Sequence, residues 1–161
     1  MDDPQLQNQI NLALNKGYYY LKFRPRSEKE LVDYLHKKAK QFSWPQEIIA
    51  AAIAVLKERG YINDENFVSW FVEARSKGKP KSMFALKQEL QCFGIAKDIL
   101  SVYFDENPLE EETLAREALI KRWKRYLVLD TKERFEKAAN FLARRGFGFE
   151  IIKKVITELE E

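Results

Sequence analysis

The most constraining feature of this 161-residue chain is an internal repeat with a period of about fifty residues. An offset of 55 residues aligns Arg24–Ser27 with Lys79–Ser82, Leu31 with Leu86, and Leu35 with Leu90. An offset of 52 residues aligns Gly94 with Gly146, Asp98 with Glu150, Ile99 with Ile151, Phe67 with Leu119, and Phe71 with Trp123. The two offsets together cover most of the chain and predict three copies of one repeat, over residues 1–62, 63–107 and 108–161.

Each repeat is expected to be helical, because apolar residues recur throughout at spacings of three and four. Ile49, Ala52, Ile53 and Leu56 form one such stripe, which would bury one face of a helix. No segment alternates between polar and apolar residues, so strands are not expected. We predict nine helices, over residues 4–22, 28–41, 45–59, 64–77, 82–93, 97–105, 109–127, 131–145 and 149–160.

Capping residues mark several ends of these helices. Three pairs have the spacing of an N-terminal capping box: Ser27 with Glu30, Ser43 with Gln46, and Asp130 with Glu133. Gly60, Gly94 and Gly146 each follow an apolar stripe and suit helix C-termini. The predicted fold class is therefore all-α, an elongated array of three tandem three-helix repeats, whose long surfaces would suit a long or repetitive partner.

The residues that usually carry catalysis or bind metals are scarce. His36 is the single histidine and Cys92 the single cysteine, so neither has a partner for a histidine-based metal site or an activated nucleophile. No glycine-rich phosphate loop is present. Residues 110–112 are three glutamates that suit a helix N-terminus better than a metal site. We therefore expect no enzyme activity, no metal and no cofactor.

The expected location is the cytoplasm. The first residues lack the apolar core of a signal peptide, and no apolar run approaches the roughly 18 residues of a membrane span. The composition gives 28 basic against 25 acidic residues, a net charge of +3 that does not by itself demand a nucleic-acid partner. The placement of the basic residues is therefore more informative than their number.

Basic residues form four local runs, which are the candidate binding residues. The runs are Arg24 and Arg26; Arg75, Lys77, Lys79 and Lys81; Lys121, Arg122, Lys124 and Arg125; and Arg144 and Arg145. The second run has no acidic residue within it. A single run of this kind is more often a solvated face. The first two runs, however, occupy equivalent repeat positions, which favours a basic strip that attracts phosphates or an acidic protein groove.

Several motifs resemble those of the RecX family, the bacterial regulators of the RecA recombinase. The run Arg26-Ser27 with Glu30-Leu31 is similar to the first-repeat pattern R-x-S-x-x-E-L. The segment Gly60–Asp64, followed by Phe67 and Arg75, resembles the pattern G-[YL]-[LI]-x-D-x-x-F…R. Glu89-Leu90 with Gly94-Ile95 and the run Leu142–Phe147 resemble motifs of the second and third repeats. The resemblance covers residues 24 to about 156, in the order and spacing of the family.

The resemblance implies a non-enzymatic modulator that binds the RecA filament on single-stranded DNA, and we expect the chain to be a monomer. Such a protein would restrain strand exchange, ATP hydrolysis and repressor cleavage in DNA repair and the SOS response, and would bind DNA weakly. Two alternatives stay open from the residues themselves: a direct DNA-binding helical module that acts without RecA, and a plain protein–protein scaffold. The basic runs named above would carry the contacts with the partner.

Overall fold

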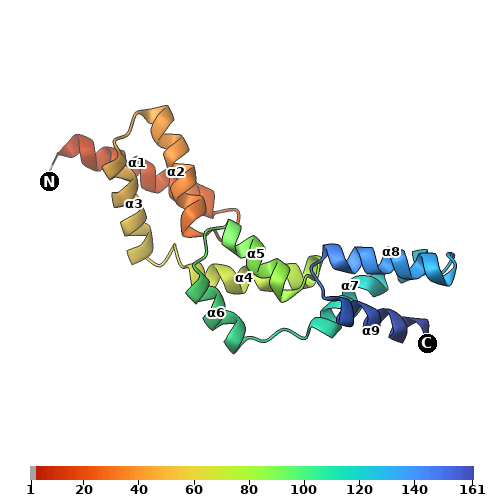
Figure 1. Ribbon diagram of the computed structural model, residues 1–161. Coiled ribbons are helices and arrows are strands. Elements are labelled where there is room, and N and C mark those ends of the chain that lie inside the picture. The colour runs from red at the N-terminus through yellow and green to blue at the C-terminus, as the bar shows by residue number, and fades with distance from the viewer. Residues whose placement is uncertain (1–2) are drawn as a thin grey trace. The chain divides into compact units, whose positions relative to one another are not determined.

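The computed structural model describes residues 3–161, and these residues form nine helices and no strand. Figure 1 shows the helices in chain order. Their bounds are α1 Pro4–Leu21, α2 Glu28–Phe42, α3 Gln46–Glu58, α4 Asp64–Gly78, α5 Met83–Cys92, α6 Lys97–Glu106, α7 Glu111–Tyr126, α8 Thr131–Arg144 and α9 Phe149–Glu160. Each predicted helix is present, with its ends within two residues of the prediction, and the all-α repeat fold is confirmed.

The chain divides into two compact units. Unit 1 contains the residues up to Trp70 together with Gln91–Ile99, and unit 2 contains Phe71–Leu90 together with Leu100–Glu161. The boundaries fall within α4, α5 and α6, so the predicted second repeat, residues 63–107, is shared between the units. The three repeat boundaries proposed from the sequence remain a prediction.

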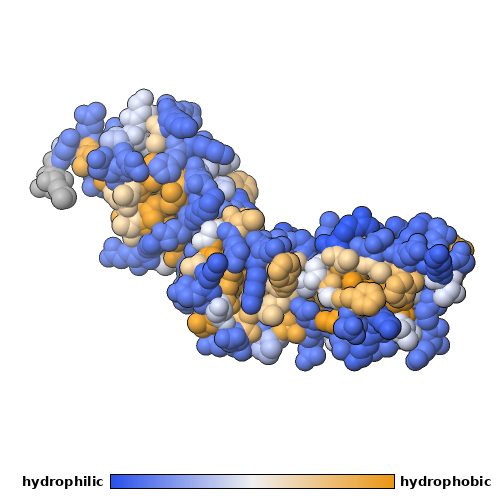
Figure 2. Space-filling view, viewed as in Figure 1, coloured by the Kyte–Doolittle hydropathy of each residue, from blue (hydrophilic) through white to orange (hydrophobic). Residues whose placement is uncertain are grey.

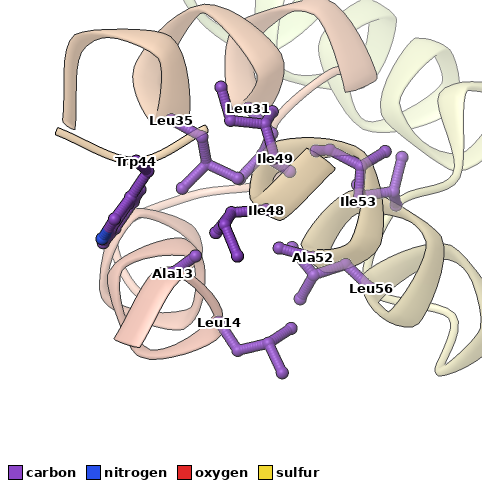
Figure 3. Close-up of a cluster of buried hydrophobic side chains, with 11 residues drawn as sticks. Ala13, Leu14, Leu31, Leu35, Trp44, Ile48, Ile49, Ala52, Ile53 and Leu56 are labelled. Atoms are coloured by element: carbon purple, nitrogen blue, oxygen red, sulfur yellow. The ribbon is translucent and has the colours of Figure 1, made fainter. Parts of the chain in front are cut away.

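The core of unit 1 is formed by α1, α2 and α3. Figure 3 shows their buried apolar side chains pointing toward one another, with Ala13 and Leu14 from α1 and Leu31 and Leu35 from α2. The stripe predicted from the sequence supplies the α3 side of this core, with Ala52 and Leu56 fully buried. Burial of each such leucine stabilises the unit by about 1.5–3 kcal/mol relative to its exposure to water.

The core of unit 2 is formed mainly by α7, α8 and α9. The side chains of Leu119, Leu142 and Val155 have no exposed surface, and each comes from a different helix of the three. Trp123, the aromatic residue inside the third basic run, is buried in this core and orients the charged residues beside it toward solvent.

The helix starts follow the predicted caps at two of three places. Ser27 and Glu30 form the complete capping box of α2, and the Asp130 carboxylate accepts a hydrogen bond from the backbone N–H of Glu133 at the start of α8. The prediction for Ser43 is wrong. Ser43 has φ 54° and ends α2 in the left-handed conformation, while Pro45 precedes α3 without a side-chain cap.

Two buried serines mark equivalent helix junctions, one in each unit. In unit 1 the Ser27 hydroxyl donates a 2.7 Å hydrogen bond to the carbonyl of Phe93. In unit 2 the Ser82 backbone N–H donates a 3.1 Å bond to the carbonyl of Arg145. The sequence offsets relate Ser27 to Ser82 and Phe93 to Arg145, so the start of one helix meets the end of another at corresponding residues in both units, although the donor is a hydroxyl in unit 1 and a backbone N–H in unit 2.

Candidate partner-binding surface

Arg24, in the first basic run, is held by contacts within unit 1. Its two terminal nitrogens lie 2.5 and 3.2 Å from the carboxylate oxygens of Glu30, a bidentate arrangement that fixes the plane of the guanidinium. The guanidinium also lies over the rings of Trp70 and Phe93, with centroid distances of 5.7 and 5.8 Å. Arg24 is therefore already paired with an acid of its own unit, and its guanidinium packs on two neighbouring aromatic rings.

Arg26 is held still more closely. Its guanidinium carbon lies 3.9 Å from the ring centroid of Tyr20, and its Nε donates to the Tyr20 carbonyl. The Tyr20 ring stacks in turn on Tyr34, with a centroid distance of 4.2 Å and nearly parallel planes. Only 13% of the Arg26 side chain is exposed. In unit 1, cation–π contacts and Glu30 balance both arginines of the run.

The second run lies in unit 2, and two acids outside the run pair with it. Arg75 Nε donates to the Glu89 carboxylate at 3.0 Å, and the Lys81 ammonium pairs with the same carboxylate. Lys77 pairs with Glu73, one helical turn earlier. The run is free of acids in sequence but not in space, because α5 supplies Glu89 and α4 supplies Glu73.

Two arginines from other runs join this site. The guanidinium carbons of Arg122 and Arg145 lie 4.7 and 4.9 Å from the ring centroid of Phe141, a buried residue of α8. Arg145 also donates to the carbonyl of Pro80, which lies between Lys79 and Lys81. Unit 2 thus gathers cations from three of the four predicted runs. We call this group the unit 2 basic cluster: Arg75, Lys79, Lys81, Arg122 and Arg145.

The cluster carries more positive charge than its internal acid balances. Burial lowers the pKa of the Lys81 ammonium, and the nearby charges of Arg75, Arg145 and Lys79 lower it further, although Lys81 pairs with Glu89. Burial and the charge of Arg122 likewise lower the pKa of Arg145. Both shifts reflect the same cause, the cost of holding several cations together in a partly desolvated site. An external anion would relieve this repulsion.

The remaining predicted residues lie outside the cluster on the surface of unit 2. Lys121, Lys124 and Arg125 are exposed on α7. Arg144 is exposed near the end of α8, where its Nε donates to the carbonyl of Asn140. Figure 2 shows hydrophilic residues over much of the visible face of α7–α9, with hydrophobic patches between them. These side chains extend the positive surface but do not share a common acid.

Sequence reasoning missed two members of this arrangement. Glu89 belongs to one of the motifs named above and Phe141 lies directly before another, but the sequence pattern does not predict that either contacts the basic runs. A signal for Glu89 did exist, since it is the first acidic residue after the second run. Its pairing with Arg75 depends on the position of α5 beside the end of α4, which the sequence pattern does not give.

The two residues considered for catalysis lie in unit 1, far apart along the chain. His36 lines an open hollow beside Lys40 and Trp44, and Cys92 is an exposed free thiol at the end of α5. Within residues 3–161, no group of three metal-ligating side chains comes together. Among the helices of these same residues, none has both the length and the apolar character needed to cross a membrane.

Comparisons with known proteins place the repeats in a family. The model of the RecX third three-helix domain matches residues 110–156, and that of the RecX first three-helix domain matches residues 13–56. Together the two matches cover more than half of the chain. The chain belongs to the RecX family. The sequence resemblance is thereby confirmed.

The relatives of this RecX-family chain are regulatory proteins by name. It is 36% identical over 158 residues to the Regulatory protein RecX of Bacillus pumilus (strain SAFR-032), a match that covers 93% of this chain and 57% of that protein. It is 32% identical over 160 residues to the Regulatory protein RecX of Bacillus subtilis (strain 168), covering 97% of this chain and 58% of that protein. The chain therefore spans a little over half the length of these relatives.

Solved RecX structures share the fold. The crystal structure of RecX from Lactobacillus salivarius superposes with a TM-score of 0.76 at 22% identity, and the match covers 96% of this chain and 98% of that one. A second crystal structure, of regulatory protein RecX, gives a TM-score of 0.75 at 21% identity, covering 95% of this chain and 74% of that one. The helical arrangement of this RecX-family chain is thus one already seen in solved RecX structures.

Proposed function

We propose that this chain is a non-enzymatic regulator that binds the RecA filament on single-stranded DNA and lowers its activity. The observation that carries the proposal is membership of the RecX family, whose relatives that match here are named regulatory proteins. The helical repeats support it, because helical repeat proteins in general suit long or repetitive partners. On this proposal the chain acts in the cytoplasm, as a monomer, in the regulation of recombination, DNA repair and the SOS response.

The proposed contact surface includes the basic runs of unit 2. The unit 2 basic cluster and the exposed cations of α7 together would attract the anionic surface of a nucleoprotein filament. Arg24 and Arg26 of unit 1 would contribute less to binding, because Glu30 and neighbouring aromatic rings already occupy their guanidinium groups. Inhibition would follow if the bound chain blocks addition of RecA subunits.

The direct test is ATP hydrolysis by preassembled RecA filaments on single-stranded DNA. We expect substoichiometric amounts of this chain to reduce the hydrolysis rate, because one bound regulator can affect many subunits of a filament. The measurement is the steady-state rate of ATP hydrolysis against the concentration of the chain. An unchanged rate, together with unchanged filament length at micromolar concentrations, would contradict the proposal.

The unit 2 basic cluster also favours a second candidate, a DNA-binding module that acts without RecA. Such a module would bind RecA-free DNA tightly, with an affinity that falls steeply as salt concentration rises. It would lower ATP hydrolysis only at concentrations high enough to cover the DNA. The concentration dependence of the hydrolysis assay therefore separates the two candidates.

The absence of catalysis can be checked with two substitutions. His36→Ala and Cys92→Ala should each leave the effect on RecA ATP hydrolysis within about threefold of the unsubstituted chain, because neither residue has a partner that would make it a catalyst or a metal ligand. Circular dichroism would show that each variant is folded. Loss of the effect in a folded His36→Ala variant would refute the non-enzymatic proposal.

A further inference from the structure

The aromatic support of Arg26 in unit 1 has a charged counterpart in unit 2. In unit 1, Arg26 lies over Tyr20, which stacks on Tyr34. The 55-residue offset pairs Tyr20 with Arg75, Arg26 with Lys81 and Tyr34 with Glu89. The two stacked rings that support Arg26 are thus replaced by a cation and a carboxylate, Arg75 and Glu89, and this carboxylate also pairs with Lys81. The same two positions of the repeat therefore hold neutral rings in unit 1 and an ion pair in unit 2.

The replacement leaves unit 2 with surplus positive charge. Arg24 of unit 1 lies over the Phe93 ring, and the two offsets relate these residues to Lys79 and Arg145 of unit 2. A cation–aromatic contact is therefore matched by two cations. Arg122 adds a further positive charge beside Arg145, over the shared ring of Phe141.

Glu89 is the acid at the centre of these cations, and its ion pairs are accessible to an external anion. The side chains of Glu89, Lys81 and Arg75 are 24%, 26% and 41% exposed, so an anion from solvent can reach the ion pairs. Partly exposed ion pairs are weak, contributing about 0–1 kcal/mol, so they do not strongly oppose replacement. Two phosphate oxygens could accept from Arg75 and Lys81 in the way the carboxylate now does.

We propose that Glu89 is an internal counter-anion that a backbone phosphate of single-stranded nucleic acid replaces at Arg75 and Lys81. Lys79, Arg122 and Arg145 then contact neighbouring phosphates. The inference deepens the proposed function, on which it rests, by naming the ligand of the cluster and the residue that competes with it.

A nucleic acid fits this exchange better than an acidic peptide. A single peptide carboxylate offers the same chemistry as Glu89, which has the advantage of being held in place within the same molecule. A nucleic acid instead brings a row of phosphates, which engages several cations at once and releases the counterions that its backbone holds. The surplus of cations around one acid therefore favours the polyanion.

The test is the binding of a fluorescein-labelled single-stranded oligonucleotide, measured by anisotropy over a range of salt concentrations. Glu89→Gln keeps the side-chain shape and removes the competing charge, so it should raise affinity at least about threefold and make the salt dependence steeper, by about 0.7 for each added phosphate contact. Glu73→Gln is the matched control. It changes net charge equally, but Glu73 pairs with Lys77 outside the cluster, so little gain is expected.

Equal affinities for Glu89→Gln and Glu73→Gln would overturn the inference, because net charge alone would then explain any gain. Stronger binding of polyglutamate than of the oligonucleotide would also overturn it and would assign the cluster to an acidic protein. Arg75→Gln provides an independent check, since it should weaken oligonucleotide binding. No RecA is present in these assays, so their failure would leave the RecA proposal standing, and an unchanged RecA ATPase would not by itself remove this site.

Discussion

Reversing the charges of Lys79 and Arg122 together should weaken binding of this chain to RecA filaments at least tenfold. The tenfold loss corresponds to about 1.4 kcal/mol. Each exposed contact contributes up to about 1 kcal/mol, and each reversal adds repulsion to the contact it removes. Lys79 is exposed at the end of α4, and Arg122 is exposed on α7, so both substitutions lie outside the buried core. The measurement is the anisotropy of the labelled chain titrated with preassembled filaments.

The matched control reverses Lys132 and Lys153 instead. Both are exposed lysines of unit 2, and this double variant changes the net charge by the same amount as Lys79→Glu with Arg122→Glu. Lys154 is not suitable for this purpose, because its ammonium pairs with Glu112 at 2.8 Å and its reversal would disturb α7 and α9. Equal weakening by both double variants would mean that the filament senses overall charge rather than the unit 2 basic cluster.

Local sequence rules were sufficient for the helices of this chain. The apolar stripe from Ile49 to Leu56 became the buried face of α3 because one face of a short amphipathic helix has to be covered. The failure at Ser43 has a specific cause. Trp44 is buried, and its backbone N–H bonds the Ala39 carbonyl, so the chain ends α2 at Ser43 and places Pro45 before α3. A capping pattern spans only a few residues. It therefore does not show that a tryptophan will be buried in a core formed by residues that are distant in sequence.

The candidate site was predictable only as separate runs of charge. The sequence locates Arg75 and Lys81 in one run, and Arg122 and Arg145 in two others, but their meeting depends on helix packing. Glu89 shows the limit most clearly. It follows Arg75 by fourteen residues, yet its carboxylate lies 3.0 Å from the Arg75 side chain. Which acid neutralises which base, and how much charge is left over, is a property of tertiary structure.

Gly146→Ala should cost about 2–5 kcal/mol of the free energy of unfolding, for two separate reasons. Gly146 has φ 87°, a left-handed conformation that costs a residue with a side chain about 1–2 kcal/mol. A Cβ at this position would also lie 2.7 Å from the Cβ of Ala85 and would collide with the Ser82 hydroxyl at the junction described above. Forced overpacking of this kind adds about 1–3 kcal/mol. Urea denaturation followed by circular dichroism measures the loss.

Gly60→Ala separates these two reasons. Gly60 has φ 78°, so alanine there carries the same backbone penalty, but a Cβ would meet no other atom within 4 Å. We therefore expect Gly60→Ala to cost only about 1–2 kcal/mol. The difference between the two variants measures how tightly the end of α8 fits against the start of α5, which is the contact that positions Arg145 beside Pro80. Equal losses in the two variants would show that this junction yields to an added methyl group, and Arg145 would then not be held in the basic cluster by packing.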